Sequence, residues 1–191
     1  MVKADAGWEA LHTEVIIPGY VIMVHLSNRV SRESFWVMGI YGDISRGESS
    51  LTEFYERLLR RLTTFVRQQA KVYWGGCFAT GDWNFLEHTG DRHPGGRGNS
   101  APKRVLEAFE GIKNLCTMQD ASRDGPAPAL WTYQKMTHHG RAYSQLDRIY
   151  KPSLGWAGGT VTPMDTSWSD HRLVIATAYV RQPKIQKAVP A

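Results

Sequence analysis

Gly81-Asp82-Trp83-Asn84 follows an apolar run at residues 72–80 that is predicted to form a strand. Two further motifs come later in the chain, Ser144-Gln145-Leu146-Asp147-Arg148-Ile149-Tyr150 and Ser169-Asp170-His171. Each motif lies inside or at the end of an apolar run, where a strand passes into a loop. Strand ends are rigid positions from which several polar side chains can converge on one point. The three motifs therefore predict a shared site.

The side chains of these motifs suit metal-assisted attack of water on a phosphate. Carboxylates provide the hard oxygen ligands that Mg²⁺ prefers. His171 can hold or accept a proton near neutral pH, and Asp147 is the carboxylate expected to fix its tautomer. Asn84 can donate a hydrogen bond to a phosphate oxygen without adding negative charge beside it. Taken one at a time, Asp82 and Asn84 are equally typical of a turn.

The ordered set Gly-Asp-Trp-Asn, Leu-Asp-Arg-Ile-Tyr and Ser-Asp-His resembles the endonuclease/exonuclease/phosphatase superfamily. Supporting stretches lie between the main motifs. Residues 35–41, Phe-Trp-Val-Met-Gly-Ile-Tyr, resemble the family strand that ends in an active-site Tyr, and residues 118–123 and 130–133 resemble the stretch leading to an aromatic strand. The resemblance implies an α/β fold, a four-layer α-β-β-α sandwich with the site at one end of its two sheets.

The resemblance also implies a role for each polar residue. His171 activates water or stabilises the charged pentavalent phosphorus state, and Asp147 orients it. Asp170 positions the metal, Mg²⁺ or Mn²⁺, or the His171 ring. Asp82 handles a proton near the attacking or leaving oxygen, and Asn84 holds a phosphate oxygen.

Three aromatic residues complete the candidate site. By resemblance, Tyr41 contacts the phosphate or the leaving group. Trp131 and Tyr133 are candidates for stacking on a sugar or base. From the residues alone, a place in the core or on its rim is favoured for all three aromatic side chains.

One part of the family pattern is not found. Family members begin with a strand carrying an Asn-x-Asn-Gly motif and then a strand carrying a metal-binding Glu, whereas Asn28 lies in Ser-Asn-Arg and Glu9 and Glu14 follow no matching apolar strand. Without the metal-binding Glu of the family, Mg²⁺ would depend on Asp170 and Asp82.

The expectation is an N-terminally incomplete domain that lacks the first strands. Residues 1–180 are then one partial domain and residues 181–191 a C-terminal tail, and the missing part of the domain on a longer chain is a candidate partner.

Elements elsewhere follow from periodicity. Pro18-Gly19 predicts the turn of a hairpin over residues 15–26, and residues 35–41 read as a central strand covered on both faces. A capping-box pattern at Ser50 predicts a helix over 50–69. Further elements are expected as a helix at 102–113 and strands at 130–133, 145–150 and 173–180. On the polar face of the first helix, the solvated interpretation of Arg57, Arg60, Arg61 and Arg67 is favoured over a phosphate-contacting one.

The composition is that of a folded protein with a basic bias. The 191 residues are 42% hydrophobic and carry a net charge of +5, which is compatible with a phosphate-rich partner but also with an ordinary soluble protein. Two cysteines cannot form a disulfide framework, and no Cys/His spacing indicates zinc. The adjacent His138 and His139 lie beside Gly140 in an expected loop and predict no metal site.

Three functions remain open at this point. The first is a Mg²⁺-dependent endonuclease of the retrotransposon or abasic-site type, acting on nucleic acid, DNA rather than RNA, and away from membranes. The second is a catalytically inactive or incomplete fragment that acts as a binding or structural remnant. The third is a phosphatase or phospholipase-type enzyme of the same superfamily.

Overall fold

The computed structural model describes residues 7–69, 77–93, 101–123, 130–153, 156–157, 160–177 and 179–180. The tail at 181–191, the start of the strand expected at 72–80 and residues 94–100 lie outside the described residues. No helix in the described part of the chain is long and apolar enough to cross a membrane.

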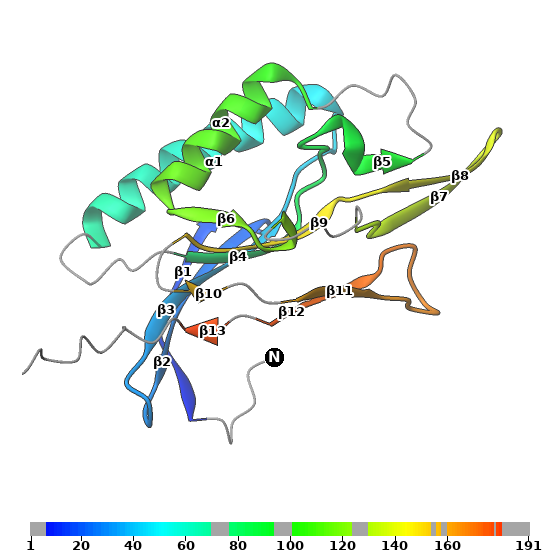
Figure 1. Ribbon diagram of the computed structural model, residues 1–191. Coiled ribbons are helices and arrows are strands. Elements are labelled where there is room, and N and C mark those ends of the chain that lie inside the picture. The colour runs from blue at the N-terminus through cyan, green and yellow to red at the C-terminus, as the bar shows by residue number, and fades with distance from the viewer. Residues whose placement is uncertain are drawn as a thin grey trace, which may run out of the picture.

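A six-stranded sheet organises the molecule (Figure 1). Its strand order is β1 (Trp8–Ile17), β2 (Val21–Asn28), β3 (Ser34–Tyr41), β4 (Cys77–Asp82), β9 (Asp147–Pro152) and β6 (Met118–Asp120). All neighbours are antiparallel except β3 and β4, which run parallel and are connected through a helix. The expected hairpin around Pro18-Gly19 is therefore confirmed, with longer strands than predicted.

The strand expected at 35–41 is central, as predicted, but its two faces are not equally covered. In β3 the side chains of Trp36, Met38 and Ile40 are buried, while the alternate positions Phe35 and Val37 are only half-buried. The buried face of the sheet is the one beneath the helices, so the alternation follows the period of two that a half-covered strand shows. The expectation that both faces are fully covered is not met among the described residues.

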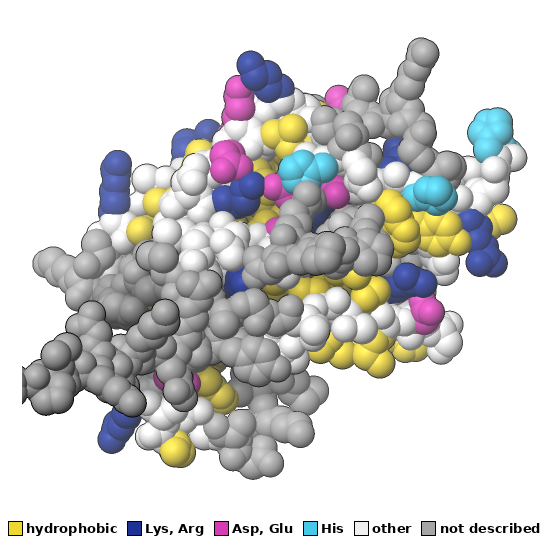
Figure 2. Space-filling view, in the orientation of Figure 1, with side chains coloured by type: hydrophobic (Ala, Val, Ile, Leu, Met, Phe, Trp, Pro, Cys, Tyr) yellow, Lys and Arg dark blue, Asp and Glu magenta, His cyan; other side chains and the backbone are white. Residues whose placement is uncertain are grey.

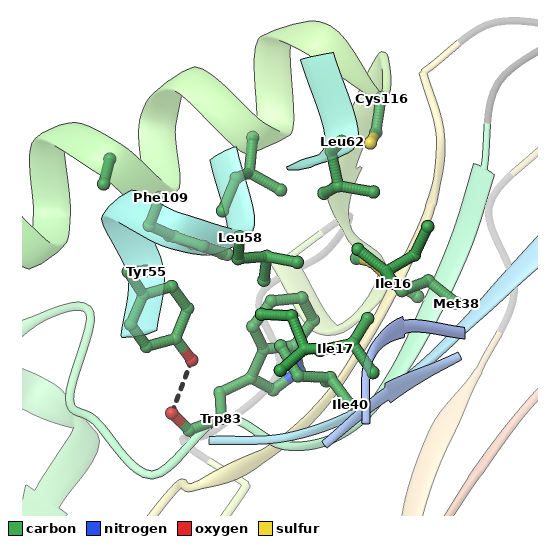
Figure 3. Close-up of a cluster of buried hydrophobic side chains, with 14 of the residues drawn as sticks. Ile16, Ile17, Met38, Ile40, Tyr55, Leu58, Leu62, Trp83, Phe109 and Cys116 are labelled. Carbon is green, nitrogen blue, oxygen red and sulfur yellow. Dashed lines mark hydrogen bonds between the residues drawn. The ribbon is translucent and has the colours of Figure 1, made fainter. Parts of the chain in front are cut away.

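Two helices cover one face of this sheet, α1 (Glu48–Gln69) and α2 (Lys103–Leu115) (Figure 1). The apolar stripe of α1 is buried as predicted and consists of Phe54, Leu58, Leu62 and Phe65. Figure 3 shows Leu58 and Leu62 of α1 and Phe109 of α2 over Met38 and Ile40 of the sheet. The helix starts two residues before the predicted capping box, because Ser50 is buried within the first turn and its hydroxyl donates to the carbonyl of Gly47 at 2.9 Å.

Short strands make up the rest of the molecule. A three-stranded sheet joins β5 (Arg92–His93), β8 (Gly140–Ser144) and β7 (Tyr133–Thr137), and two pairs join β11 (Val161–Met164) to β12 (Leu173–Ala176) and β10 (Trp156–Ala157) to β13 (Tyr179–Val180). Single turns of 3-10 helix occur at η2 (Thr89–Asp91) and η3 (Ala121–Arg123). In Figure 1 both pairs lie on the side of the main sheet away from the helices. The α/β sandwich is thus confirmed, with a helical layer, a main sheet and short strands beyond it.

Two expectations about these strands were wrong. The β7–β8 hairpin was predicted only as the strand 130–133, because its side chains are largely exposed and carry no apolar period. The strand expected at 173–180 is two strands, β12 and β13, which belong to different pairs. His138 and His139 do form the turn of the β7–β8 hairpin, in agreement with the expected loop.

Candidate active site

Asp82 and Asp147 lie opposite each other where β4 and β9 pair. Gly81 precedes Asp82 with a φ of 144°, and a side chain there would collide with the carbonyl oxygen of Ile40 on β3. Only glycine accepts that conformation and that approach together. The glycine of the motif therefore lets β4 pack against β3 closely enough to bring Asp82 to the end of the sheet.

His171 is bound to Asp147. Its Nδ1 lies 2.8 Å from Oδ2 of Asp147, so the other ring nitrogen, Nε2, is left for a ligand. His171 also forms an isolated bridge to Tyr133, whose ring centroid lies 4.9 Å from that of His171. The predicted pairing of Asp147 with His171 is thus observed in the geometry.

Three candidate ligand atoms converge. One atom each from Asp82, Asp147 and His171 lie within 4.8 Å of one another. Asp82 Oδ1 accepts the backbone N–H of Asn84 at 2.9 Å, and Asp147 Oδ2 is taken by His171. Within the described residues, the other oxygen of each carboxylate, Asp82 Oδ2 and Asp147 Oδ1, makes no hydrogen bond.

The electrostatics of this cluster follow from burial and from the crowding of carboxylates. Burial raises the pKa of Asp82, and the charge of Asp147 raises it further, against the opposing effects of the Asn84 N–H and the positive charges of His171 and Arg148. Burial lowers the pKa of His171, but the hydrogen bond to Asp147 and the negative charges around the ring outweigh burial. The net effect is to raise the pKa of His171, so the imidazolium is stabilised there.

Asn84 is held in an uncommon conformation. Its φ is 54°, a left-handed value that asparagine tolerates better than most residues. Its side-chain Nδ2 donates to the carbonyl of Gly42 at 2.8 Å, which leaves the second amide hydrogen for another acceptor. The turn after β4 thus orients the Asn84 amide.

A cleft of about 490 Å³ joins most of the predicted residues. Six of the eight predicted site residues line it: Tyr41, Asp82, Asn84, Tyr133, Asp170 and His171. Asp147 does not line the cleft, but it is hydrogen-bonded to His171, which does. Trp131 is not part of the lining; its ring is half-buried and lies 5.9 Å from the ring of His93.

Tyr41 and Asp170 lie toward the rim. Tyr41 is 53% exposed and stacks on Tyr20 with an angle of 15° between the rings. Asp170 is exposed, and its carboxylate is not among the three ligand atoms that converge within 4.8 Å. Its backbone carbonyl accepts the N–H of Gln134 at 3.0 Å, which attaches the Ser169–His171 motif to β7.

The sequence suggests Arg92, in a loop beside the site, as a residue that could meet phosphate or be solvated, but it does not single out Thr132 or Glu48. Thr132 is fully buried, and its hydroxyl accepts the backbone N–H groups of Leu146 and Asp147 at 3.0 and 2.9 Å, so it fixes the backbone that carries Asp147. Arg92 and Glu48 line the cleft from β5 and from the first turn of α1. Thr132 directly precedes β7, and its burial, like the places of Arg92 and Glu48, depends on tertiary packing.

Comparison with known proteins finds similar folds among solved structures. No family model and no curated protein matches the chain. Among solved structures, the endonuclease domain of TRAS1, a telomere-specific non-LTR retrotransposon, is similar over 95% of this chain and 72% of its own, with 14% identity and a TM-score of 0.59. An endonuclease/exonuclease/phosphatase family protein from Bacteroides thetaiotaomicron is similar over 93% of this chain and 67% of its own, at 10% identity and a TM-score of 0.56.

The chain has the endonuclease/exonuclease/phosphatase fold. A third structure with this fold, the AP endonuclease LMAP from Leishmania major, matches 86% of the chain at 18% identity with a TM-score of 0.63, and the chain spans 55% of its length. The fold predicted from the three motifs is therefore confirmed. A fold alone does not assign an activity, which depends on the side chains that line the cleft.

Proposed function

We propose that the cleft hydrolyses phosphodiester bonds of nucleic acid with the help of a divalent cation, as an endonuclease acting on DNA. The observation that carries this proposal is the convergence of Asp82, Asp147 and His171, with one ligand atom from each within 4.8 Å of the others. Support for a nucleic-acid substrate comes from the basic net charge of +5 and from the similarity in fold to a retrotransposon endonuclease domain and an AP endonuclease.

The carboxylates of the cluster fit a divalent cation. Asp82 Oδ2 and Asp147 Oδ1 have no hydrogen bond among the described residues, and the charge of Asp147 raises the pKa of Asp82. A cation between the two carboxylates would relieve that repulsion. Asp82 and Asp147 would hold Mg²⁺ or Mn²⁺, and Asp170 is a further candidate from the rim. When bound, the metal polarises a phosphoryl oxygen and lowers the pKa of water.

His171 then takes the proton of the attacking water. Its Nδ1 is bound to Asp147, so Nε2 is the atom that can accept a proton from the cleft. The carboxylate of Asp147 keeps the neutral ring in the tautomer with Nε2 unprotonated and stabilises the imidazolium that forms.

The remaining residues act on the phosphate and on the leaving group. As a ligand of the cation Asp82 would be ionised, so the leaving oxygen takes its proton from solvent. The second amide hydrogen of Asn84 donates to a non-bridging phosphate oxygen. Tyr41 contacts the leaving group from the rim of the cleft, and Tyr133 stacks beside His171 on the sugar or base.

The test is hydrolysis by the purified chain with Mg²⁺ or Mn²⁺ on four substrates: supercoiled plasmid, single-stranded RNA, bis(p-nitrophenyl) phosphate and p-nitrophenyl phosphate. We expect nicked plasmid and diester hydrolysis that are lost in EDTA and reduced about 10²- to 10⁴-fold in His171→Ala. The matched control is His139→Ala, which removes an exposed imidazole in the β7–β8 turn.

Each alternative gives its own result. Turnover of the monoester alone would assign a phosphatase in place of the nuclease. A folded protein that binds Mn²⁺ but hydrolyses none of the four substrates would assign a binding remnant. Plasmid nicking that persists in His171→Ala would contradict the proposed role of the Asp147–His171 pair.

A further inference from the structure

A second hollow, separate from the cleft, lies between α1 and the edge strand β1. Its volume is about 620 Å³, and it is lined by residues from these two elements: Glu14, Val15, Ile16, Arg57, Arg60, Arg61, Thr64, Phe65 and Gln68. None of these residues lines the cleft that holds His171. We call this hollow the arginine groove.

Three arginines of the groove share one face of α1. Arg57, Arg60 and Arg61 are spaced at i, i+3 and i+4, so their guanidinium groups are neighbours on the helix surface, where like charges repel. All three are exposed, and none has an ion-pair partner among the described residues. Glu14 is the single carboxylate of the lining, and it lies beside His12 at 3.5 Å. The groove therefore carries an excess of positive charge.

Six other cations of the described surface form ion pairs. Arg29, Arg46, Lys103, Arg104, Lys113 and Arg172 each have a carboxylate partner within ion-pair distance. On the face shown in Figure 2, the Lys and Arg side chains are scattered and do not gather in one patch. Arg32, Arg67, Arg92, Lys135 and Arg141 are also exposed without an ion-pair partner among the described residues. Arg57, Arg60 and Arg61 differ from these in being neighbours on one face of one helix, where their charges add.

The shape and donors of the groove match a chain of phosphates. Guanidinium groups bind phosphate oxygens in pairs of parallel hydrogen bonds, which is why arginine is favoured where phosphate is recognised. Gln68 adds neutral donors at the end of the row, and Thr64 adds a hydroxyl. The floor is formed by Ile16 and Phe65, which are 6% and 5% exposed, so it offers the ligand no stacking surface. Contacts to backbone phosphates, without readout of bases, are what such a lining can make.

We propose that the arginine groove binds the phosphodiester backbone of nucleic acid at a site distinct from the catalytic cleft. The choice of nucleic acid over a small polyphosphate rests on the proposed function, whereas the site itself rests on the three unpaired arginines. The groove binds the phosphate backbone without sequence preference.

The test measures binding, without metal, so that it does not depend on catalysis. Fluorescence anisotropy with a labelled DNA duplex in EDTA gives the binding constant of the full chain over 50–300 mM salt, a range of about sixfold chosen to resolve the counterion release of phosphate contacts. The variant is Arg57→Gln, Arg60→Gln, Arg61→Gln. The matched control changes the net charge equally at other surface positions, Arg29→Gln, Arg32→Gln and Lys103→Gln.

We expect the groove variant to bind about 10- to 10²-fold more weakly at 0.1 M salt. The slope of log K against log salt should fall by about 2 to 3, because each phosphate contact contributes about 0.9. The control should leave the slope unchanged. Equal effects of the two triple variants, or an unchanged slope in the groove variant, would overturn the proposal.

Two further measurements distinguish nucleic acid from a small anion as the ligand of the groove, and a defect in the groove from a defect in the cleft. Inorganic tripolyphosphate that binds the groove while DNA does not would assign the site to a small anion and overturn the choice of nucleic acid. Hydrolysis of bis(p-nitrophenyl) phosphate should be equal in the chain and in its groove variant, because this substrate is too small to reach both sites. Loss of binding without loss of that activity distinguishes failure of the groove from failure of the cleft.

Discussion

Asp147 Oδ2 and His171 Nδ1 lie 2.8 Å apart although 24 residues separate them in the chain. Asp147 begins β9 in the main sheet. His171 instead forms an isolated β-bridge with Tyr133, the first residue of β7. The pair therefore joins the main sheet to the short strands beyond it. The hydrogen bond between Asp147 and His171 can form only when these two parts of the molecule are packed together.

Replacing Asp147 with Asn should reduce plasmid nicking by about 10²-fold or more, because the amide can donate to Nδ1 and then stabilises the wrong tautomer of His171. The measurement is the initial rate of nicking at saturating Mg²⁺. Glu107→Gln on the exposed side of α2 removes a carboxylate without touching the cleft and should keep the full rate. A rate in Asp147→Asn equal to that control would refute the pairing mechanism.

Metal affinity should distinguish Asp82 from Asp170. The Asp82 carboxylate belongs to the group of atoms within 4.8 Å, and that of Asp170 does not. Asp82→Asn should raise the Kd for Mn²⁺ about 10-fold or more, and Asp170→Asn should raise it less. Calorimetric titration of Mn²⁺ into each folded variant measures this directly. The reverse order of the two Kd values would move the metal site toward the rim and support the role predicted for Asp170.

Gly81→Ala should lower the free energy of unfolding by at least about 2 kcal/mol, because a methyl group at a φ of 144° is strained and meets the carbonyl of Ile40. Gly90→Ala is the matched control, since a methyl group there has no atom within 4 Å. Urea unfolding of both variants gives the comparison. Equal stabilities would mean that β3 and β4 are not packed as closely as described.

Lowering the pH should remove the contribution of Glu87 to the free energy of unfolding. Burial raises the pKa of this carboxyl, but hydrogen bonds from Lys113 at 2.7 Å and Tyr150 at 2.9 Å, with the positive charges nearby, bring it below its ordinary value of 4.5. A carboxyl with a lowered folded-state pKa stabilises the fold above its unfolded pKa, and this stabilisation is lost as the pH falls through the folded value.

Glu87→Gln should therefore cost about 1.5–3 kcal/mol of unfolding free energy at pH 7, and less as the pH falls below 4.5. Denaturant unfolding between pH 3 and pH 7, a range of roughly four units across the ordinary glutamate pKa, measures the difference. Glu110→Gln is the control, because Glu110 contacts the same Lys113 from an exposed position. A cost for Glu87→Gln that does not change with pH would exclude this linkage.

Much of the candidate site could be predicted because its residues lie at the ends of strands, which an apolar run in the sequence marks. Asp82, Asp147 and His171 each end or begin a strand-like run, and the sheet brings such ends together. The β7–β8 hairpin could not be predicted, because its exposed side chains leave no periodic signal. Arg92 enters the cleft because β5 pairs with β8, a register that no local pattern encodes. The place of Trp131 beside His93, away from the cleft lining, likewise depends on that register.

The hydroxyl of Tyr55 donates to the backbone carbonyl of Trp83 at 2.6 Å, as Figure 3 shows, and Trp83 stands between Asp82 and Asn84. Both residues are fully buried, so the turn after Asp82 is anchored to the helical layer, and we expect its amide hydrogens to exchange slowly. His171 lies outside that core, before β12, in an isolated bridge to Tyr133, and we expect local opening there to require less free energy. The candidate site is therefore held in two ways: Asp82 stands beside the buried core, whereas His171 is attached through its bridge to Tyr133 and its hydrogen bond to Asp147.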